Sequence, residues 1–147
     1  MGQSASDLPS GVREAVITRL EEAPVSLALL FGSYATGHAT TGSDVDIAVE
    51  YDETLEDVTD THLSLVADLT RILGRDDLDV VRLTSVDPRV AVEALDYGQL
   101  LVGTAEEATQ LRTRLEAARQ TQDELVQSRI ENAERKIERR LQRREHG

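Results

Sequence analysis

The sequence predicts a single α/β or α+β domain, a small mixed β-sheet flanked by helices, followed by a long C-terminal helix. First, short apolar runs with the length of strands alternate with longer segments whose apolar residues recur at helical spacing. Second, a length of 147 residues leaves room for one compact domain and an appended helix. We place the domain at residues 1–103 and the helical extension at residues 104–147.

The first predicted elements are a helix and a strand. Apolar residues recur at helical spacing over residues 11–22, and Pro24 follows them, which predicts a helix that ends there. The nearly continuous apolar run at residues 25–31 predicts a strand covered on both faces. Gly32 and Ser33 therefore follow directly after a buried strand.

A second strand is predicted over residues 45–51, after a small, polar and glycine-containing stretch at residues 34–43. Side chains alternate between the two faces of a strand, so Asp44 and Asp46 project from the same face, opposite the apolar residues. The two carboxylates are then close enough to share a cation.

The remaining elements again alternate between helix and strand. Their boundaries follow from apolar periodicity, from a glycine at a helix end and from an Asp-Pro pair at a helix start. We predict a helix over residues 55–73, a strand over 78–83, a helix from Asp87 and Pro88 to near Gly98, and a short strand over 100–102.

The C-terminal segment differs from the rest of the chain. Thr104 and Glu107 have the spacing of a helix capping box, and a narrow apolar stripe follows them. Residues 1–103 hold 19 acidic and 6 basic residues, whereas residues 104–147 hold 9 and 10. The stripe can pack on its own domain, on a second copy or on a partner, so a homo- or hetero-oligomer is possible. It consists of Leu111, Leu115, Ala118, Gln122, Leu125, Ala133, Ile137 and Leu141.

The composition excludes several kinds of protein. Without cysteine, the chain has no disulfides, thiolate catalysis or cysteine-ligated zinc. A net charge of -12 argues against direct binding to nucleic acid phosphates. No apolar run approaches the roughly 20 residues that span a bilayer, so we expect no membrane association and a cytoplasmic location. The acidic balance, with arginine in place of lysine, resembles proteins of salt-loaded cytoplasms and suggests a halophilic host.

Three aspartates form the candidate metal site. Asp79 is an isolated charge in a predicted apolar strand, where burial is costly without a partner, and it is the natural third ligand beside Asp44 and Asp46. Hard oxygen ligands suit Mg²⁺ or Mn²⁺, which complete their shells with phosphate oxygens of a substrate. Two alternatives stay open: Asp77 is a rival ligand in a predicted turn, and Asp79 can instead pair with an arginine such as Arg82.

The glycine and serine after the first strand form a candidate phosphate loop. Gly32 allows the backbone to approach a phosphate closely, and backbone amides and the Ser33 hydroxyl can donate hydrogen bonds to its oxygens. The small and polar composition of this candidate loop continues at Gly37, Gly42 and Ser43. The alternative role of these residues is a flexible connection between strands. The loop is not a Walker A motif, because no Gly-Lys-Ser/Thr sequence occurs in it. We take Gly32, Ser33 and Ser43 as candidate nucleotide-binding residues.

The spacing of these residues resembles a known pattern: Gly32-Ser33, ten residues, then Asp44-Val45-Asp46, with Asp79 on a later strand. This arrangement resembles the DNA polymerase β-like nucleotidyltransferase superfamily. More narrowly, residues 31–37 and 42–49 are similar to the minimal nucleotidyltransferases, the MNT family, which are small antitoxins paired with HEPN toxins. The resemblance covers about residues 10–103.

This resemblance implies a fold and an activity. The fold is a polymerase β-like mixed sheet in which Gly32 and Ser33 grip the triphosphate, while Asp44 and Asp46 hold two Mg²⁺ ions. Asp79 binds the metal nearest the acceptor hydroxyl and can serve as general base. The implied reaction is transfer of AMP from ATP to a tyrosine hydroxyl of a partner HEPN toxin, which makes the chain an antitoxin.

Two other functions fit the same residues. One is a non-catalytic antitoxin that neutralises its partner by binding. The other is a nucleotidyltransferase for a small molecule such as an aminoglycoside, although that class usually has a larger C-terminal domain. No lysine or arginine lies between Phe31 and Arg71, so neutralisation of phosphate charge is expected to fall mainly on the metals, which leaves open a weakened or slow enzyme.

Overall fold

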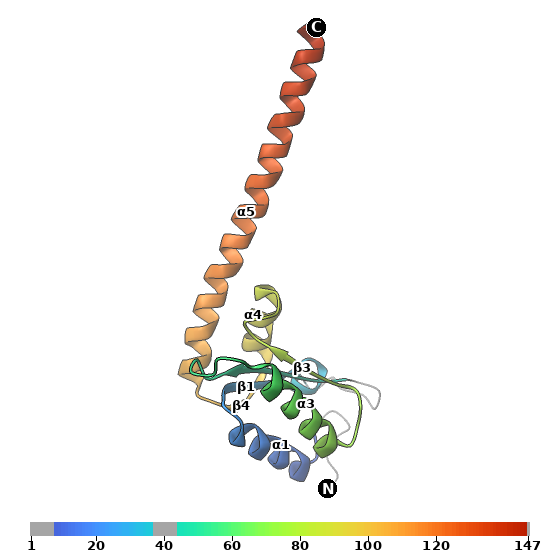
Figure 1. The fold of residues 1–147 in the computed structure, drawn as a ribbon, viewed down its shortest axis with the longest axis vertical. Coiled ribbons are helices and arrows are strands. Elements are labelled where there is room, and N and C mark those ends of the chain that lie inside the picture. Colours follow the sequence, from blue (N-terminus) through green and yellow to red (C-terminus); the bar gives the residue numbers. More distant parts are fainter. Residues whose placement is uncertain (1–7, 37–43, 147) are drawn as a thin grey trace.

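A four-stranded mixed sheet organises the chain (Figure 1). The computed structural model describes residues 8–36 and 44–146, with the backbone alone at residues 33, 36, 145 and 146. The sheet has the order β3-β2-β1-β4, in which β1 pairs antiparallel with β2 and β4, while β2 and β3 are parallel. The predicted small mixed sheet is therefore confirmed. Its strands are β1 (Val25–Phe31), β2 (Val45–Tyr51), β3 (Leu78–Arg82) and β4 (Gln99–Val102).

Helices cover both faces of the sheet. On one face α1 and α3 bury Val16, Leu20, Leu65 and Leu69 against the strands. On the other face α4 and the beginning of α5 form a second apolar cluster with β1. The helices are α1 (Ser10–Glu22), α2 (Ser33–Thr36), α3 (Thr59–Leu73), α4 (Pro88–Tyr97) and α5 (Ala105–His146).

The alternation along β2 decides which face carries the acidic residues. Val45, Ile47 and Val49 are fully buried in the cluster formed with α1 and α3. Ala48 belongs to the cluster on the opposite side, with α4 and α5. Because side chains alternate, Asp46 projects toward the α4 side, as the sequence pattern predicts.

Several helix ends form as the sequence predicts. Gly74 ends α3 in a left-handed conformation with φ of 66°, which glycine adopts without strain. The Asp87 carboxylate caps α4 by accepting from the Arg89 amide at 2.9 Å. The Thr104 hydroxyl accepts from the Glu107 amide at 3.1 Å at the start of α5, which confirms the capping interaction.

Other boundaries differ from the prediction. Helix α3 begins at Thr59 rather than at residue 55, because the Asp57 side chain accepts a hydrogen bond from the Thr59 amide at 2.9 Å and so caps the helix. Strand β3 ends at Arg82, one residue early. The short helix α2 is not predicted from the sequence.

Helix α5 rises away from the domain as one long rod (Figure 1). Leu111 and Leu115 are buried against the domain, so the apolar stripe does pack on its own domain at its base. Leu125, Ile137 and Leu141 are exposed. In the part of the chain that the structure describes, no helix is long and apolar enough to cross a membrane.

The α3 packing gives a stability prediction. Leu69 is 0% exposed in the core between α3 and the sheet, so Leu69→Ala is expected to lower the free energy of unfolding by about 2–5 kcal/mol. Leu63 lies on the same helix but is 62% exposed, and Leu63→Ala is expected to change it by less than about 0.5 kcal/mol. Urea unfolding followed by circular dichroism measures both. Equal losses in the two variants would contradict this packing.

Candidate active site

The backbone turn after β1 lies directly against an acidic side chain of β2. Phe31 pairs with Asp46 in the antiparallel register, and Gly32 follows with φ of 74°. A Cβ atom at position 32 would lie 2.5 Å from the Asp46 Oδ2 atom. Both the left-handed backbone and this close approach therefore require glycine here.

The register of β2 and β3 brings two predicted ligands together. In this parallel pair Asp46 is the partner of Asp79. The Val45 amide also donates a hydrogen bond to the Asp77 carbonyl at 2.9 Å, just before β3. Residues paired across a ladder point to the same face of a sheet. Asp79 and Asp46 therefore share the face that α4 covers, and both lie at the end of the sheet where Gly32 turns.

The electrostatics of Asp46 couple the three aspartates. Burial raises the pKa of the Asp46 carboxyl, and the negative charges of Asp79 and then of Asp44 raise it further. Asp44 itself is exposed, immediately before β2. The structure thus brings the three carboxylates near enough to repel one another.

The chemistry of this donor set fits a hard divalent cation. A partly buried carboxylate whose pKa is raised by burial and by two neighbouring carboxylates is a favourable environment for a cation such as Mg²⁺, which prefers oxygen ligands. Across the described ranges, no three acidic or histidine side chains lie close enough together to form a ready-made metal cluster. Like charges separate when no cation holds them together. Joint metal binding by Asp44, Asp46 and Asp79 stays a prediction.

The candidate phosphate loop is described only at its start. Ser33 is the first residue of α2, a single helical turn in which the Ala35 amide donates to the Gly32 carbonyl at 3.1 Å. The Ser33 side chain lies outside the described atoms. Gly37, Gly42 and Ser43 lie outside the described residues.

Side chains from two other elements, β4 and α1, hold this helical turn. The Gln99 side-chain amide, at the start of β4, donates to the Ala35 carbonyl at 3.0 Å. Arg13 of α1 in turn donates to the Gln99 Oε1 atom at 3.1 Å. The position of α2 relative to the sheet is therefore fixed by contacts that no local sequence pattern indicates.

Arg75 is a cation that the sequence analysis missed. It lies between α3 and β3, donates to the Tyr34 hydroxyl at 2.7 Å and has its guanidinium 5.6 Å from the centre of that ring. It also forms a two-point ion pair with Asp77, one contact being 2.5 Å. Hydrogen bonds to Asp77 and Tyr34 raise the pKa of Arg75, and Arg75 lowers the pKa of Asp77.

This arrangement changes two expectations. A positive charge does lie beside the start of the candidate phosphate loop, although Arg75 is 41 residues from Tyr34 in the sequence. Asp77, the rival metal ligand, is instead held by Arg75. The sequence indicates these contacts of Arg75 only indirectly. They depend on the parallel pairing of β2 and β3, which brings the segment before β3 next to the segment before β2.

A hollow opens beside the glycine on the same face of the sheet. Its volume is about 450 Å³, and its walls come from the end of β1 and from α4. Tyr97 is 68% exposed and Val90 is 45% exposed, so this part of α4 presents apolar surface to solvent. The lining residues are Phe31, Gly32, Val90, Glu93, Ala94 and Tyr97.

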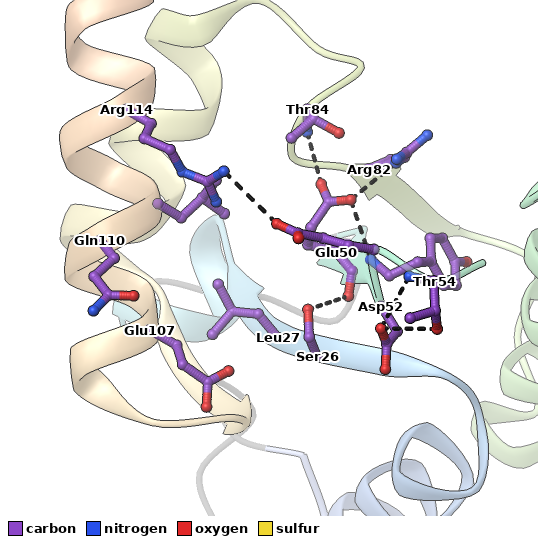
Figure 2. A pocket seen from close by; sticks show the side chains of 13 residues that line it. Ser26, Leu27, Glu50, Asp52, Thr54, Arg82, Thr84, Glu107, Gln110 and Arg114 are labelled. Atoms are coloured by element: carbon purple, nitrogen blue, oxygen red, sulfur yellow. Dashed lines mark hydrogen bonds and ion pairs between the residues drawn. The ribbon is translucent and has the colours of Figure 1, made fainter. Parts of the chain in front are cut away.

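A second hollow of about 510 Å³ lies at the other end of β2 (Figure 2). Glu50 accepts from Arg82 at 3.0 Å and from the Thr84 amide at 3.1 Å, so its charge is matched locally. Glu50 is four residues beyond Asp46 on one strand, a separation of roughly 13 Å. Arg82 therefore pairs with Glu50, which argues against the alternative that it pairs with Asp79.

Known proteins share both the sequence and the fold of this chain. Residues 14–107 match the family described as polymerase beta, nucleotidyltransferase. A candidate protein adenylyltransferase of Methanocaldococcus jannaschii is 49% identical over 45 residues, 31% of this chain and 45% of that protein. The chain thus covers somewhat under half the length of that relative.

Solved structures extend the likeness to most of the chain. A toxin-antitoxin crystal structure with AMP-PNP is 26% identical, has a TM-score of 0.67 and covers 82% of this chain and 97% of its own. The MNT antitoxin in complex with tri-AMPylated Shewanella oneidensis HEPN toxin has a TM-score of 0.62 at 24% identity, covering 83% and 95%, which establishes a shared fold. With its aspartates on the paired strands and its glycine turn, the chain belongs to the polymerase β-type nucleotidyltransferase family.

Proposed function

We propose that this chain is a metal-dependent nucleotidyltransferase that transfers AMP from ATP to a tyrosine hydroxyl of a partner HEPN toxin and so acts as its antitoxin. The observation that carries the proposal is the register of β2 and β3, which sets Asp46 beside Asp79 and under Gly32 in a member of this family. The relatives described with AMP-PNP and with an AMPylated HEPN toxin support the choice of nucleotide and partner.

Each of the candidate site residues has a proposed role. The backbone of Gly32 and the hydroxyl of Ser33 would hold the triphosphate, while Asp44 and Asp46 would hold Mg²⁺. When bound, Mg²⁺ neutralises charge on the phosphates during the displacement. Arg75 supports this loop through Tyr34.

The chemistry needs one proton acceptor. The acceptor oxygen forms a bond to the α-phosphorus of ATP, the bond from that phosphorus to the bridging oxygen breaks, and pyrophosphate leaves with the electron pair. Asp79 takes the proton from the acceptor hydroxyl. The hollow between Gly32 and α4 opens on the face that carries Asp46 and Asp79, and its apolar walls suit an aromatic acceptor such as tyrosine.

The two other functions differ in what they require. A small-molecule transferase of the aminoglycoside type usually has a second substrate-binding domain, whereas residues 105–146 form one helix here. An antitoxin that acts by binding alone has no need for Asp46 and Asp79 to be held together at a cost in repulsion. The enzyme is therefore the better supported proposal.

Loss of one carboxylate tests the catalytic proposal. With labelled ATP, Mg²⁺ and the product of the neighbouring reading frame, the wild type is expected to label that partner, and Asp46→Asn is expected to lower the rate at least about 100-fold. Asp60→Asn, an exposed aspartate at the start of α3, is the matched control and is expected to label at the wild-type rate. If the wild type labels nothing while Asp46→Asn still neutralises the partner, the chain acts by binding alone.

Removal of metal gives a second test of the same site. The raised pKa of Asp46 means that its ionised form destabilises the fold, and stability falls as the pH rises from the unfolded pKa through the folded one. In EDTA at neutral pH, Asp46→Asn is therefore expected to have a higher Tm than the wild type. Mg²⁺ is expected to raise the Tm of the wild type and not that of the variant. Equal Mg²⁺ effects on both would place the metal elsewhere.

The glycine turn gives a third test. Gly32→Ala introduces a Cβ atom against the Asp46 carboxylate on a left-handed backbone, so transfer is expected to fall at least about tenfold. The control is Gly11→Ala in α1, where a Cβ atom meets open space. Initial rates with ATP measure both variants. If Gly32→Ala transfers AMP at the wild-type rate, the close approach of the Gly32 backbone to Asp46 is not needed for the reaction.

A further inference from the structure

The upper part of α5 carries apolar side chains that its own domain leaves uncovered. From residue 120 to residue 144 every described side chain is exposed. Ile130 is 47% exposed and Ile137 is 57% exposed, and the helix runs clear of the domain in this part (Figure 1). In proteins most of the stability of a helix comes from the packing of its apolar face, so a covering partner would contribute to keeping α5 helical.

These side chains continue the face that is buried at the base. Val126 and Ile137 lie 11 and 22 residues beyond the buried Leu115. Eleven residues make close to three turns of an α-helix, so residues at this spacing share one face in a straight line. Ile130 and Leu141 follow the same spacing. We call the set Val126, Ile130, Ala133, Ile137 and Leu141 the α5 stripe.

Helix α4 covers the base of this face and runs antiparallel to α5. Arg112 of α5 pairs with Asp96 near the end of α4 at 2.5 Å, and Asp123 of α5 pairs with Arg89 near its start. The ion pair between Arg89 and Asp123 marks the upper limit of the contacts between α4 and α5, and the α5 stripe begins at Val126, three residues further along. The stripe therefore continues an existing helix-helix interface.

The charges of α5 are divided along its length. Residues 116–134 hold five acidic and two basic residues, whereas residues 135–145 hold six basic and two acidic residues. Two such helices side by side in the same direction would place like halves together. Two helices in opposite directions would place the acidic half of each beside the basic half of the other.

We propose that the α5 stripe pairs with the α5 stripe of a second copy of this chain, antiparallel, in a two-fold dimer. The domain lies at one end of α5 and on the side where α4 packs, so a parallel second helix would collide with it (Figure 1). In the antiparallel dimer the two domains lie at opposite ends of the helix pair. Each basic helix end then approaches the acidic domain of the other copy, since residues 1–103 hold 19 acidic and 6 basic residues.

The spacing of the stripe sets the register. A two-fold axis between Ala133 and Glu134 places Val126 level with Leu141 of the second copy, and Ile130 level with Ile137 of the second copy. The end of the second helix then reaches the level of Asp123, where α4 stops. The paired segments extend over roughly 40 Å of helix. This dimer is independent of the proposed transfer reaction.

The first experiment measures the molar mass of the full chain by sedimentation velocity over a concentration series. The expected mass is twice 16.2 kDa. Ile137→Glu puts a charge into the middle of the stripe and is expected to weaken dimerisation at least about 100-fold. Leu125→Glu is the matched control: Leu125 belongs to the apolar stripe predicted from the sequence, but it lies about 100° around the helix from Val126 and is not part of the α5 stripe. Leu125 is 55% exposed, and this variant is expected to stay dimeric. Circular dichroism checks that both variants keep their helix.

The second experiment tests the orientation, using the absence of natural cysteine. Val126→Cys and Leu141→Cys are prepared separately, mixed and oxidised. The antiparallel register is expected to give a disulfide between the two variants in the mixture and none within either variant alone.

Three results would overturn the proposal. The first is a monomer at all concentrations. If the chain is a monomer and Ile137→Glu loses binding to the HEPN toxin, the α5 stripe is assigned to that partner. The second is a dimer that Ile137→Glu leaves intact. The third is disulfide formation within each cysteine variant alone, which indicates parallel helices.

Discussion

The parallel register of β2 and β3 is the constraint on which the site depends. It places Asp46 beside Asp79 on one face of the sheet and near one end of it. The antiparallel register of β1 and β2 then brings the turn at Gly32 onto the same carboxylate. Because both ladders lie between two covered faces, the strands cannot shift to relieve the repulsion among the acidic groups.

A chain with 28 acidic residues needs a criterion for which carboxylates are functional. Several acidic groups on or beside the sheet pair with a cation: Asp68 pairs with Arg19, Asp77 with Arg75 and Glu50 with Arg82. By contrast, the charges that act on Asp46 are those of other carboxylates. Perturbed ionisation of this kind, with no matching cation among its causes, is typical of sites that bind a ligand.

The two ends of β2 show the contrast, among the described residues, between a paired and an unmatched carboxylate within one strand. Glu50 is matched by Arg82 and by a backbone amide, so the hollow around it is a satisfied polar surface despite its larger volume. At the other end, Gly32, which lies against Asp46, borders a smaller hollow with apolar walls and an exposed tyrosine. Volume alone would point to the wrong end of the strand, whereas charge balance points to the aspartates.

The sequence by itself predicted the helices and strands other than α2, and it singled out the candidate aspartates. Apolar runs, the glycine at a helix end and the caps at Asp87 and Thr104 act over a few residues, so local patterns predicted them. The start of α3 was misplaced because the cap at Asp57 competes with the apolar pattern before it. The tertiary structure alone decided the strand order, the partner of Arg75, the support of α2 by Gln99 and how much of α5 is covered. Those features depend on contacts between residues tens of positions apart, which periodicity and spacing along one chain do not encode.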